Sequence, residues 1–140
     1  MALLGLPLFA CSSSEGKDVQ FLTAALSLDR LDSQVILSIP LNGCSGCAQE
    51  SIAFSRENFD KQGFYISLIG DDKKEAIYYK KEYFSNQKNV IALDLEEALA
   101  NEINVQFPSY YFISKSGTEK TVINAQTLQE SLSRIKNKLE

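Results

Sequence analysis

Residues 35–54, VILSIPLNGCSGCAQESIAF, place a Cys-x-x-Cys pair between two segments of different sequence periodicity. The first segment, residues 35–41, is a short run of apolar and branched side chains, which is typical of a strand buried on both faces. Pro40 limits this strand to an end near position 40, because proline cannot donate to a sheet ladder. From Ala48 onward the apolar residues are spaced as in an amphipathic helix. The stretch therefore predicts a strand, a turn that carries two cysteines, and a helix.

Comparable patterns continue on both sides of this stretch. Helices are expected over residues 18–32, 48–59, 73–84, 95–105 and 127–140, and further strands over residues 64–70, 89–94, 109–114 and 120–124. Asp71 or Asp72 is expected to cap the helix at 73–84. Alternation of strands and helices implies crossover connections and a mixed, mostly parallel central sheet with helices on both faces. A C-terminal hairpin and helix complete the predicted α/β domain, which spans residues 17–140.

Composition and charge exclude several classes of protein. A chain of 140 residues has the length of one ordinary domain. A net charge of -4 argues against a nucleic-acid-binding surface, which depends on clustered Lys and Arg. The sequence contains no His, so a catalytic triad with His and a His-ligated metal or haem site are excluded. Cysteine chemistry in this protein would have to proceed without imidazole.

The N-terminal segment 1–16 has a different character from the rest of the chain. An apolar block ends at Cys11 and is followed at once by a Ser-rich stretch. The sequence Leu8-Phe9-Ala10-Cys11 resembles the bacterial lipobox, although no Lys or Arg precedes Lys17 as a secretory signal would require. The resemblance implies a signal peptide and tether over residues 1–16, with Cys11 as lipid anchor. The domain would then belong to the bacterial cell envelope and face the periplasm or the cell surface. The alternative is an apolar N-terminal helix or strand with a buried Cys11.

The two cysteines Cys44 and Cys47 are the candidate catalytic residues. A cysteine at the turn from a strand into a helix lies at the helix N-terminus, where free N–H groups and the helix dipole favour the thiolate. Cys44 is therefore the expected nucleophile. Cys47 lies one helical turn further on, where it can attack a mixed disulfide formed on Cys44.

Other roles are open to the pair. A zinc site is disfavoured, because it needs two more ligands and the chain has no His and only one further Cys. A purely structural disulfide is also disfavoured, because closing so small a ring adds little loop-closure entropy. A Cu(I) carrier is a stronger alternative, because two thiolates are enough to hold that ion. A redox-inactive scaffold that binds a partner through its surface is the remaining one. No metal or other cofactor is expected for the preferred disulfide-exchange function.

Two separate pieces of the sequence resemble the thioredoxin superfamily, and within it membrane-tethered thiol-disulfide oxidoreductases of the TlpA and peroxiredoxin type. They are the strand, Cys44-Ser45-Gly46-Cys47 and following helix, and the later stretch 90–118, VIALDLEEALANEINVQFPSYYFISKSGT. The resemblance implies that Pro108 is the family's cis proline. It also implies that Phe107 presents its backbone to a thiol partner, and that Gly43 helps to shape the docking groove.

The sequence departs from the family pattern at several positions. Gly43 replaces the Trp that precedes the first cysteine, and Ser38 stands where thioredoxin has a buried acid. Glu50, one turn along the helix, could assist deprotonation of Cys47, but surface exposure is the simpler expectation for it. The peroxidatic Pro-x-x-x-Thr/Ser-x-x-Cys pattern is absent around Cys44. The sequence therefore predicts a monomeric, extracytoplasmic thiol-disulfide oxidoreductase that acts on partner proteins, with reduction slightly favoured over oxidation.

Overall fold

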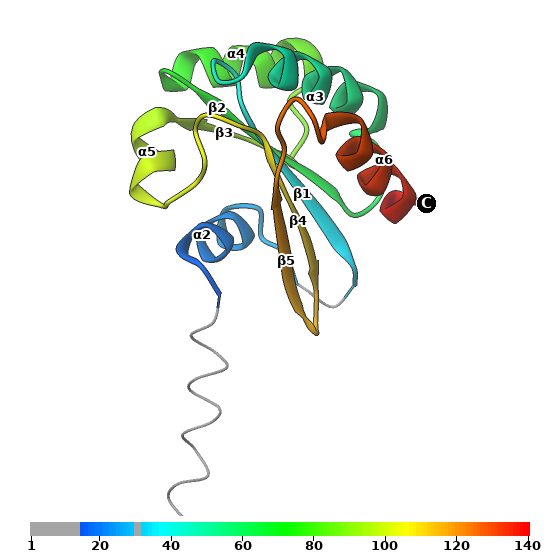
Figure 1. The fold of residues 1–140 in the computed structure, drawn as a ribbon. Coiled ribbons are helices and arrows are strands. Elements are labelled where there is room, and N and C mark those ends of the chain that lie inside the picture. The colour runs from blue at the N-terminus through cyan, green and yellow to red at the C-terminus, as the bar shows by residue number, and fades with distance from the viewer. Residues whose placement is uncertain (1–14, 30–31) are drawn as a thin grey trace, which may run out of the picture.

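The computed structural model describes residues 15–29 and 32–140, and its centre is a five-stranded sheet (Figure 1). The strands are β1 (Gln34–Pro40), β2 (Phe64–Gly70), β3 (Val90–Asp94), β4 (Ser109–Ser114) and β5 (Gly117–Val122). They lie in the order β3-β2-β1-β4-β5. β1 pairs parallel to β2, and β2 parallel to β3, whereas β4 pairs antiparallel to both β1 and β5.

Helices cover both faces of the sheet. One face packs against α3 (Ser45–Asn58), α4 (Lys73–Phe84) and α6 (Leu128–Leu139), and the other against α2 (Lys17–Ala25) and α5 (Leu95–Ala100). Figure 1 shows α2 and α5 together on one side of the strands, with α3 and α6 on the other. This layered arrangement confirms the predicted α/β class, including the C-terminal hairpin and helix. It is also the arrangement that the resemblance to the thioredoxin superfamily implied.

The central strand β1 explains why the core has two halves. All seven of its residues are buried. Successive side chains of a strand point to opposite faces, so Leu37 and Ile39 belong to the cluster under α3, α4 and α6, while Ile36 belongs to the cluster under α2 and α5. Burial of one such aliphatic side chain contributes roughly 1.5–3 kcal/mol. The near-continuous apolar run in the sequence therefore contributes side chains to both hydrophobic clusters.

The parallel strands bring three connections to the same edge of the sheet. β1, β2 and β3 run in one direction, so the segments that follow their C-terminal ends lie next to one another. These segments are the loop 41–44, the start of α4 and the start of α5. In open α/β sheets this edge is where ligands and reactive groups usually gather.

Two helices end several residues before the sequence pattern predicts. The helix expected over 18–32 ends at Ala25, because Ser27 has a left-handed backbone with φ of 57°. The helix expected over 95–105 ends at Ala100, and Glu102 has a φ of 59°. A residue in this conformation ends a right-handed helix. Apolar side chains just beyond both ends, such as Leu28 and Val105, still pack against the core, which is why their spacing resembled a continuing helix.

Candidate functional site

The cysteine pair lies where β1 passes into α3. Cys44 is the N-cap residue of α3 and is partly exposed, whereas Cys47 in the first turn is buried, with 1% of its surface accessible. Both are free thiols. The strand, turn and helix predicted around the pair are therefore present, and one sulfur faces solvent while the other is enclosed.

The surroundings of Cys44 favour its thiolate. A hydrogen bond from the Cys47 thiol, aided by the backbone N–H groups of Cys47 and Gly46, lowers the pKa of Cys44 below its ordinary value of 9.0. Burial opposes this shift but does not outweigh it. The N–H groups at the start of α3 therefore favour the thiolate electrostatically, although the Cys44 side chain forms no capping hydrogen bond of the kind an oxygen makes at an ordinary N-cap.

The surroundings of Cys47 have the opposite effect. Burial, reinforced by the hydrogen bond to Cys44 and by the charge on the Cys44 sulfur, raises the pKa of Cys47 to about 11. The first proton lost by the pair therefore comes from Cys44. The site therefore combines an accessible thiol that ionises more readily than an ordinary cysteine with a buried thiol that keeps its proton at neutral pH.

The loop before β4, residues 101–108, lies directly against the loop 41–44 that leads into α3. We call the loop 41–44 the dithiol loop. The backbone N–H of Cys44 donates to the carbonyl oxygen of Gln106 at 2.7 Å. A Cβ atom at Gly43 would lie 2.3 Å from the same oxygen, so only glycine allows this approach. The side chain of Asn104 shapes the loop, because its Oδ1 accepts from the N–H groups of Gln106 at 2.9 Å and Phe107 at 2.8 Å.

The prediction of a cis bond before Pro108 is wrong. The residues that the structure describes contain no cis peptide bond, so the Phe107–Pro108 bond is trans, the lower-energy form. With this bond trans, the turn at Asn104 places the carbonyl oxygen of Gln106 next to the backbone N–H of Cys44. Pro108 is buried and Phe107 partly buried beside the dithiol loop. The substrate-binding role of Gly43, Phe107 and Pro108 stays a prediction.

The remaining sequence candidates fall into two groups. Glu50 is exposed, as expected for surface, and Cys11 lies outside the described residues. Ser38 is buried on β1 in register with Ser67 on β2 and Ser109 on β4. All three hydroxyls are buried and have no hydrogen-bond partner in the part of the chain that the structure describes. A row of small hydroxyls thus occupies the place where the family resemblance put a buried acid.

Sequence reasoning missed a contact on the other side of the dithiol loop. The Nδ2 of Asn42 donates to Oε1 of Glu75 at 2.8 Å. Glu75 lies in the first turn of α4, 33 positions further along the chain. The only local signal was the Asp72-x-x-Glu75 spacing, which indicates a helix start but not a bond to the dithiol loop.

Comparisons with known proteins are sparse. No protein-family model matches the chain, and no curated protein matches it. Among solved structures it is similar to a peroxiredoxin-like protein from Aquifex aeolicus, with 15% identity and a TM-score of 0.47. That match covers 79% of this chain and 73% of the other. A likeness at this level assigns neither a family nor an activity, so the functional argument rests on the geometry of the site.

Two further findings concern the same described residues. They contain no group of three or more His, Cys, Asp or Glu side chains that could hold a metal ion. Among them, no helix combines the length and the apolar character needed to cross a membrane.

Proposed function

We propose that this protein is a thiol-disulfide oxidoreductase that exchanges disulfides with partner proteins through Cys44 and Cys47. The observation that carries the proposal is the asymmetry of the pair. Cys44 is accessible and its pKa is lowered, whereas Cys47 is buried and its pKa is raised to about 11. A structural disulfide needs no such difference, but an exchange reaction requires one attacking sulfur and one resolving sulfur.

In the first step the Cys44 thiolate attacks one sulfur of a partner disulfide. The partner's S–S bond breaks, a new S–S bond forms to Cys44, and the departing partner sulfur takes up a proton. The N–H groups at the start of α3 stabilise the attacking thiolate before this step. Their interaction is lost as Cys44 becomes neutral in the mixed disulfide.

In the second step Cys47 loses its proton and attacks the Cys44 sulfur. The mixed disulfide breaks, the second partner sulfur leaves as a thiol, and Cys44 and Cys47 become joined. The partner has then gained two electrons and two protons. The protein has lost two electrons and the Cys47 proton, and the second proton comes from solvent, to which Cys44 released its own proton on ionising. Consumption of the Cys44 thiolate removes the negative charge that raises the pKa of Cys47, so the resolving thiol becomes easier to ionise. A dithiol donor would have to return the pair to its reduced state.

Reduction of the partner is the proposed direction, and the surface around Cys44 is the proposed docking site. The partner chain would contact Gly43 in the dithiol loop, and Phe107 and Pro108 in the loop before β4. We further propose that Cys11 anchors the domain to a bacterial envelope membrane through lipid, with the domain facing the periplasm or the cell surface. An oxidising compartment of that kind lets a dithiol cycle between its two states.

A Cu(I) carrier is the alternative use of the same sulfurs. Such a carrier holds the ion with two thiolates. Cys47 is buried and only Cys44 is partly exposed, so an ion that arrives from solvent meets one sulfur of the pair, which favours exchange over metal transport.

The test uses the full chain and glutathione disulfide as the probe. The Cys47→Ala variant should accumulate a one-to-one glutathione adduct on Cys44, because no second sulfur can resolve it. The wild type should instead form the Cys44–Cys47 disulfide and release two glutathione molecules per protein. Peptide mass mapping identifies the modified cysteine and separates it from Cys11.

The matched control is the Cys44→Ala variant, which retains the buried thiol. It should form little adduct at Cys47 under the same conditions. Equal modification of Cys47 in this variant would contradict the assigned roles. A wild type that forms neither the adduct nor the internal disulfide would overturn the proposed exchange function.

A further inference from the structure

Two helices at the dithiol edge of the sheet begin with the same spacing of acidic residues. α4 begins after Asp72 and carries Glu75 three positions on, and α5 begins after Asp94 and carries Glu97 three positions on. In each case the N-cap aspartate accepts the backbone N–H of the glutamate, at 2.9 Å in α4 and 2.8 Å in α5. The spacing is that of a capping box, in which the glutamate returns to the backbone N–H of its own N-cap residue.

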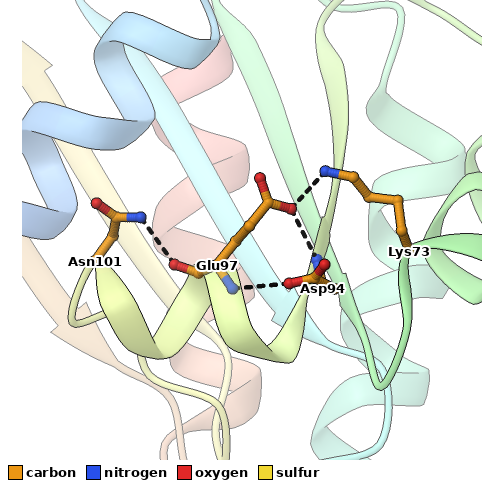
Figure 2. Close-up of polar contacts among 4 residues, drawn as sticks. All are labelled: Lys73, Asp94, Glu97 and Asn101. Atoms are coloured by element: carbon orange, nitrogen blue, oxygen red, sulfur yellow. Dashed lines mark hydrogen bonds and ion pairs between the residues drawn. The ribbon is translucent and has the colours of Figure 1, made fainter.

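The α5 pair completes its capping box. Glu97 Oε1 accepts the backbone N–H of Asp94 at 3.3 Å, as Figure 2 shows. The same oxygen pairs with Lys73 from the first turn of α4, and the Glu97 carbonyl accepts from the side chain of Asn101 at 2.8 Å. Glu97 therefore caps α5 and links it to α4 through Lys73, and none of these contacts involves the dithiol loop.

Glu75 makes different contacts. Its Oε1 accepts the backbone N–H of Asp71 at 2.9 Å and the side-chain N–H of Asn42 at 2.8 Å. Asp71 precedes the N-cap residue, so the glutamate reaches back beyond its own cap toward the loop that follows β1. Glu75 is partly buried, whereas its partner Asn42 is exposed. A charged acceptor makes a stronger hydrogen bond than a neutral one.

The dithiol loop is thus attached to other parts of the chain on both sides of Gly43. Asn42 is bonded to Glu75 of α4, and Cys44 is bonded through its N–H to the carbonyl of Gln106. Gly43 itself has no side chain and approaches Gln106 closely. Backbone bonds from Leu41 to Ile69 at 2.8 Å and from Gly43 to Pro40 at 3.2 Å also hold this segment. The bond to Glu75 is a side-chain contact that joins it to α4, so its loss removes a link between the loop and that helix.

We propose that Glu75 is a positioning residue for the dithiol, which holds Cys44 in its reactive orientation through the hydrogen bond to Asn42. The inference rests on the proposed exchange function of Cys44 and deepens it. Cys44 must keep its sulfur close to the N–H groups of Gly46 and Cys47 to remain a good nucleophile, and Asn42 lies two residues before it. Small losses of orientation at a reacting group reduce rates strongly.

The test measures the rate at which Cys44 of the reduced full chain is alkylated, as a function of pH, with peptide mass mapping. Glu75→Ala and Asn42→Ala should each slow the reaction at neutral pH by about threefold to tenfold, because a freer Cys44 loses part of its thiolate stabilisation. The double variant should be no slower than either single variant, since both remove one shared contact.

Two further variants separate positioning from charge and from helix stability. Glu75→Gln keeps the acceptor oxygen and should retain the wild-type rate within about twofold, or exceed it because a negative charge is removed. Glu97→Ala breaks the corresponding capping box of α5 and should lower the unfolding midpoint without slowing Cys44. Equal slowing in Glu97→Ala, an unchanged rate in Glu75→Ala, or multiplied effects in the double variant would overturn the proposal.

This experiment distinguishes failure of the inference from failure of the proposed function. Alkylation needs only the reduced thiol and involves no partner disulfide, so the role of Glu75 is tested even if the pair does not cycle. The glutathione experiment on the wild type tests exchange itself and does not depend on Glu75.

Discussion

The backbone N–H of Cys44 donates to the carbonyl oxygen of Gln106 at 2.7 Å, which joins the dithiol loop to the loop before β4. The contact is possible because Gly43 has no side chain at the point where the two loops meet. The position of Cys44 is therefore fixed in part by a residue 62 positions further along the chain.

Substitution of the two glycines around Cys44 should have opposite effects. Gly43→Ala places a Cβ 2.3 Å from the backbone oxygen of Gln106, so the loops must separate. We expect it to lower the free energy of unfolding by about 1–3 kcal/mol, as overpacking does, and to slow exchange. Gly46 is the matched control, because a Cβ there meets nothing within 4 Å and the residue lies in helix α3.

Gly46→Ala should therefore be neutral or stabilise the protein by about 0.5–1 kcal/mol, because alanine has the higher helix propensity. Urea titration of both variants measures these differences. A Gly43→Ala variant as stable and as reactive as Gly46→Ala would show that the close approach to Gln106 does not matter.

The pH dependence of thiol alkylation should differ between the two cysteines. In the reduced protein Cys44 should react with a midpoint below 9.0, because hydrogen bonds from Cys47 and from backbone N–H groups lower its pKa. Cys47 should react only as the pH approaches about 11. In Cys44→Ala the midpoint of Cys47 should fall, because the Cys44 charge and hydrogen bond are gone. A single shared midpoint in the wild type would contradict the asymmetry of the site.

A buried carboxylate links the N-terminal helix to the sheet and should make stability depend on pH. Asp18 Oδ2 accepts from the hydroxyl of Tyr111 at 2.8 Å and from Nζ of Lys120 at 2.6 Å. Burial by itself raises the pKa of Asp18, but these hydrogen bonds and the charge of Lys120 lower it below 3.8. The native state therefore binds the proton less tightly than the unfolded chain. The stabilisation is present above about pH 4 and is lost as the pH falls through the native pKa.

Asp18→Asn should lower the free energy of unfolding at pH 7 by about 1–3 kcal/mol, the usual range for hydrogen bonds to a charged group. The stability of the variant should also change less between about pH 5 and pH 2 than that of the wild type, because the variant has no carboxylate at position 18 to take up a proton. Glu119→Gln removes an exposed pair with Arg134 and serves as the control, with an expected change of about 0–1 kcal/mol. Equal losses in the two variants would argue against a special role for Asp18.

Several parts of the fold followed directly from local sequence. The strands at 64–70 and 109–114 and the helix at 73–84 were predicted with the bounds that the structure has. Each is a continuous periodic segment with a clear end, such as Gly70 or the cap Asp72, whose side chain accepts from the N–H of Glu75. Local propensity and tertiary packing agree in these segments, so the pattern alone was sufficient.

The parts that sequence could not supply depend on distant contacts. The positions of Cys44 at the start of α3 and of Cys47 in its first turn could be inferred from their spacing after a strand. The bond from Asn42 to Glu75 could not, because two surface residues 33 positions apart meet only after the parallel strands align their ends. The trans bond before Pro108 also differed from the expectation, which came from a family resemblance and not from the residues themselves.

The most direct test of the central claim is the redox equilibrium of the full chain in metal-free glutathione buffers, measured by thiol alkylation and peptide mass mapping. The account predicts a reversible two-electron couple confined to Cys44 and Cys47, at a potential near that of thioredoxin, roughly −270 mV, if the protein acts as a reductant. A pair that stays reduced or stays oxidised across the whole range of buffers would contradict it.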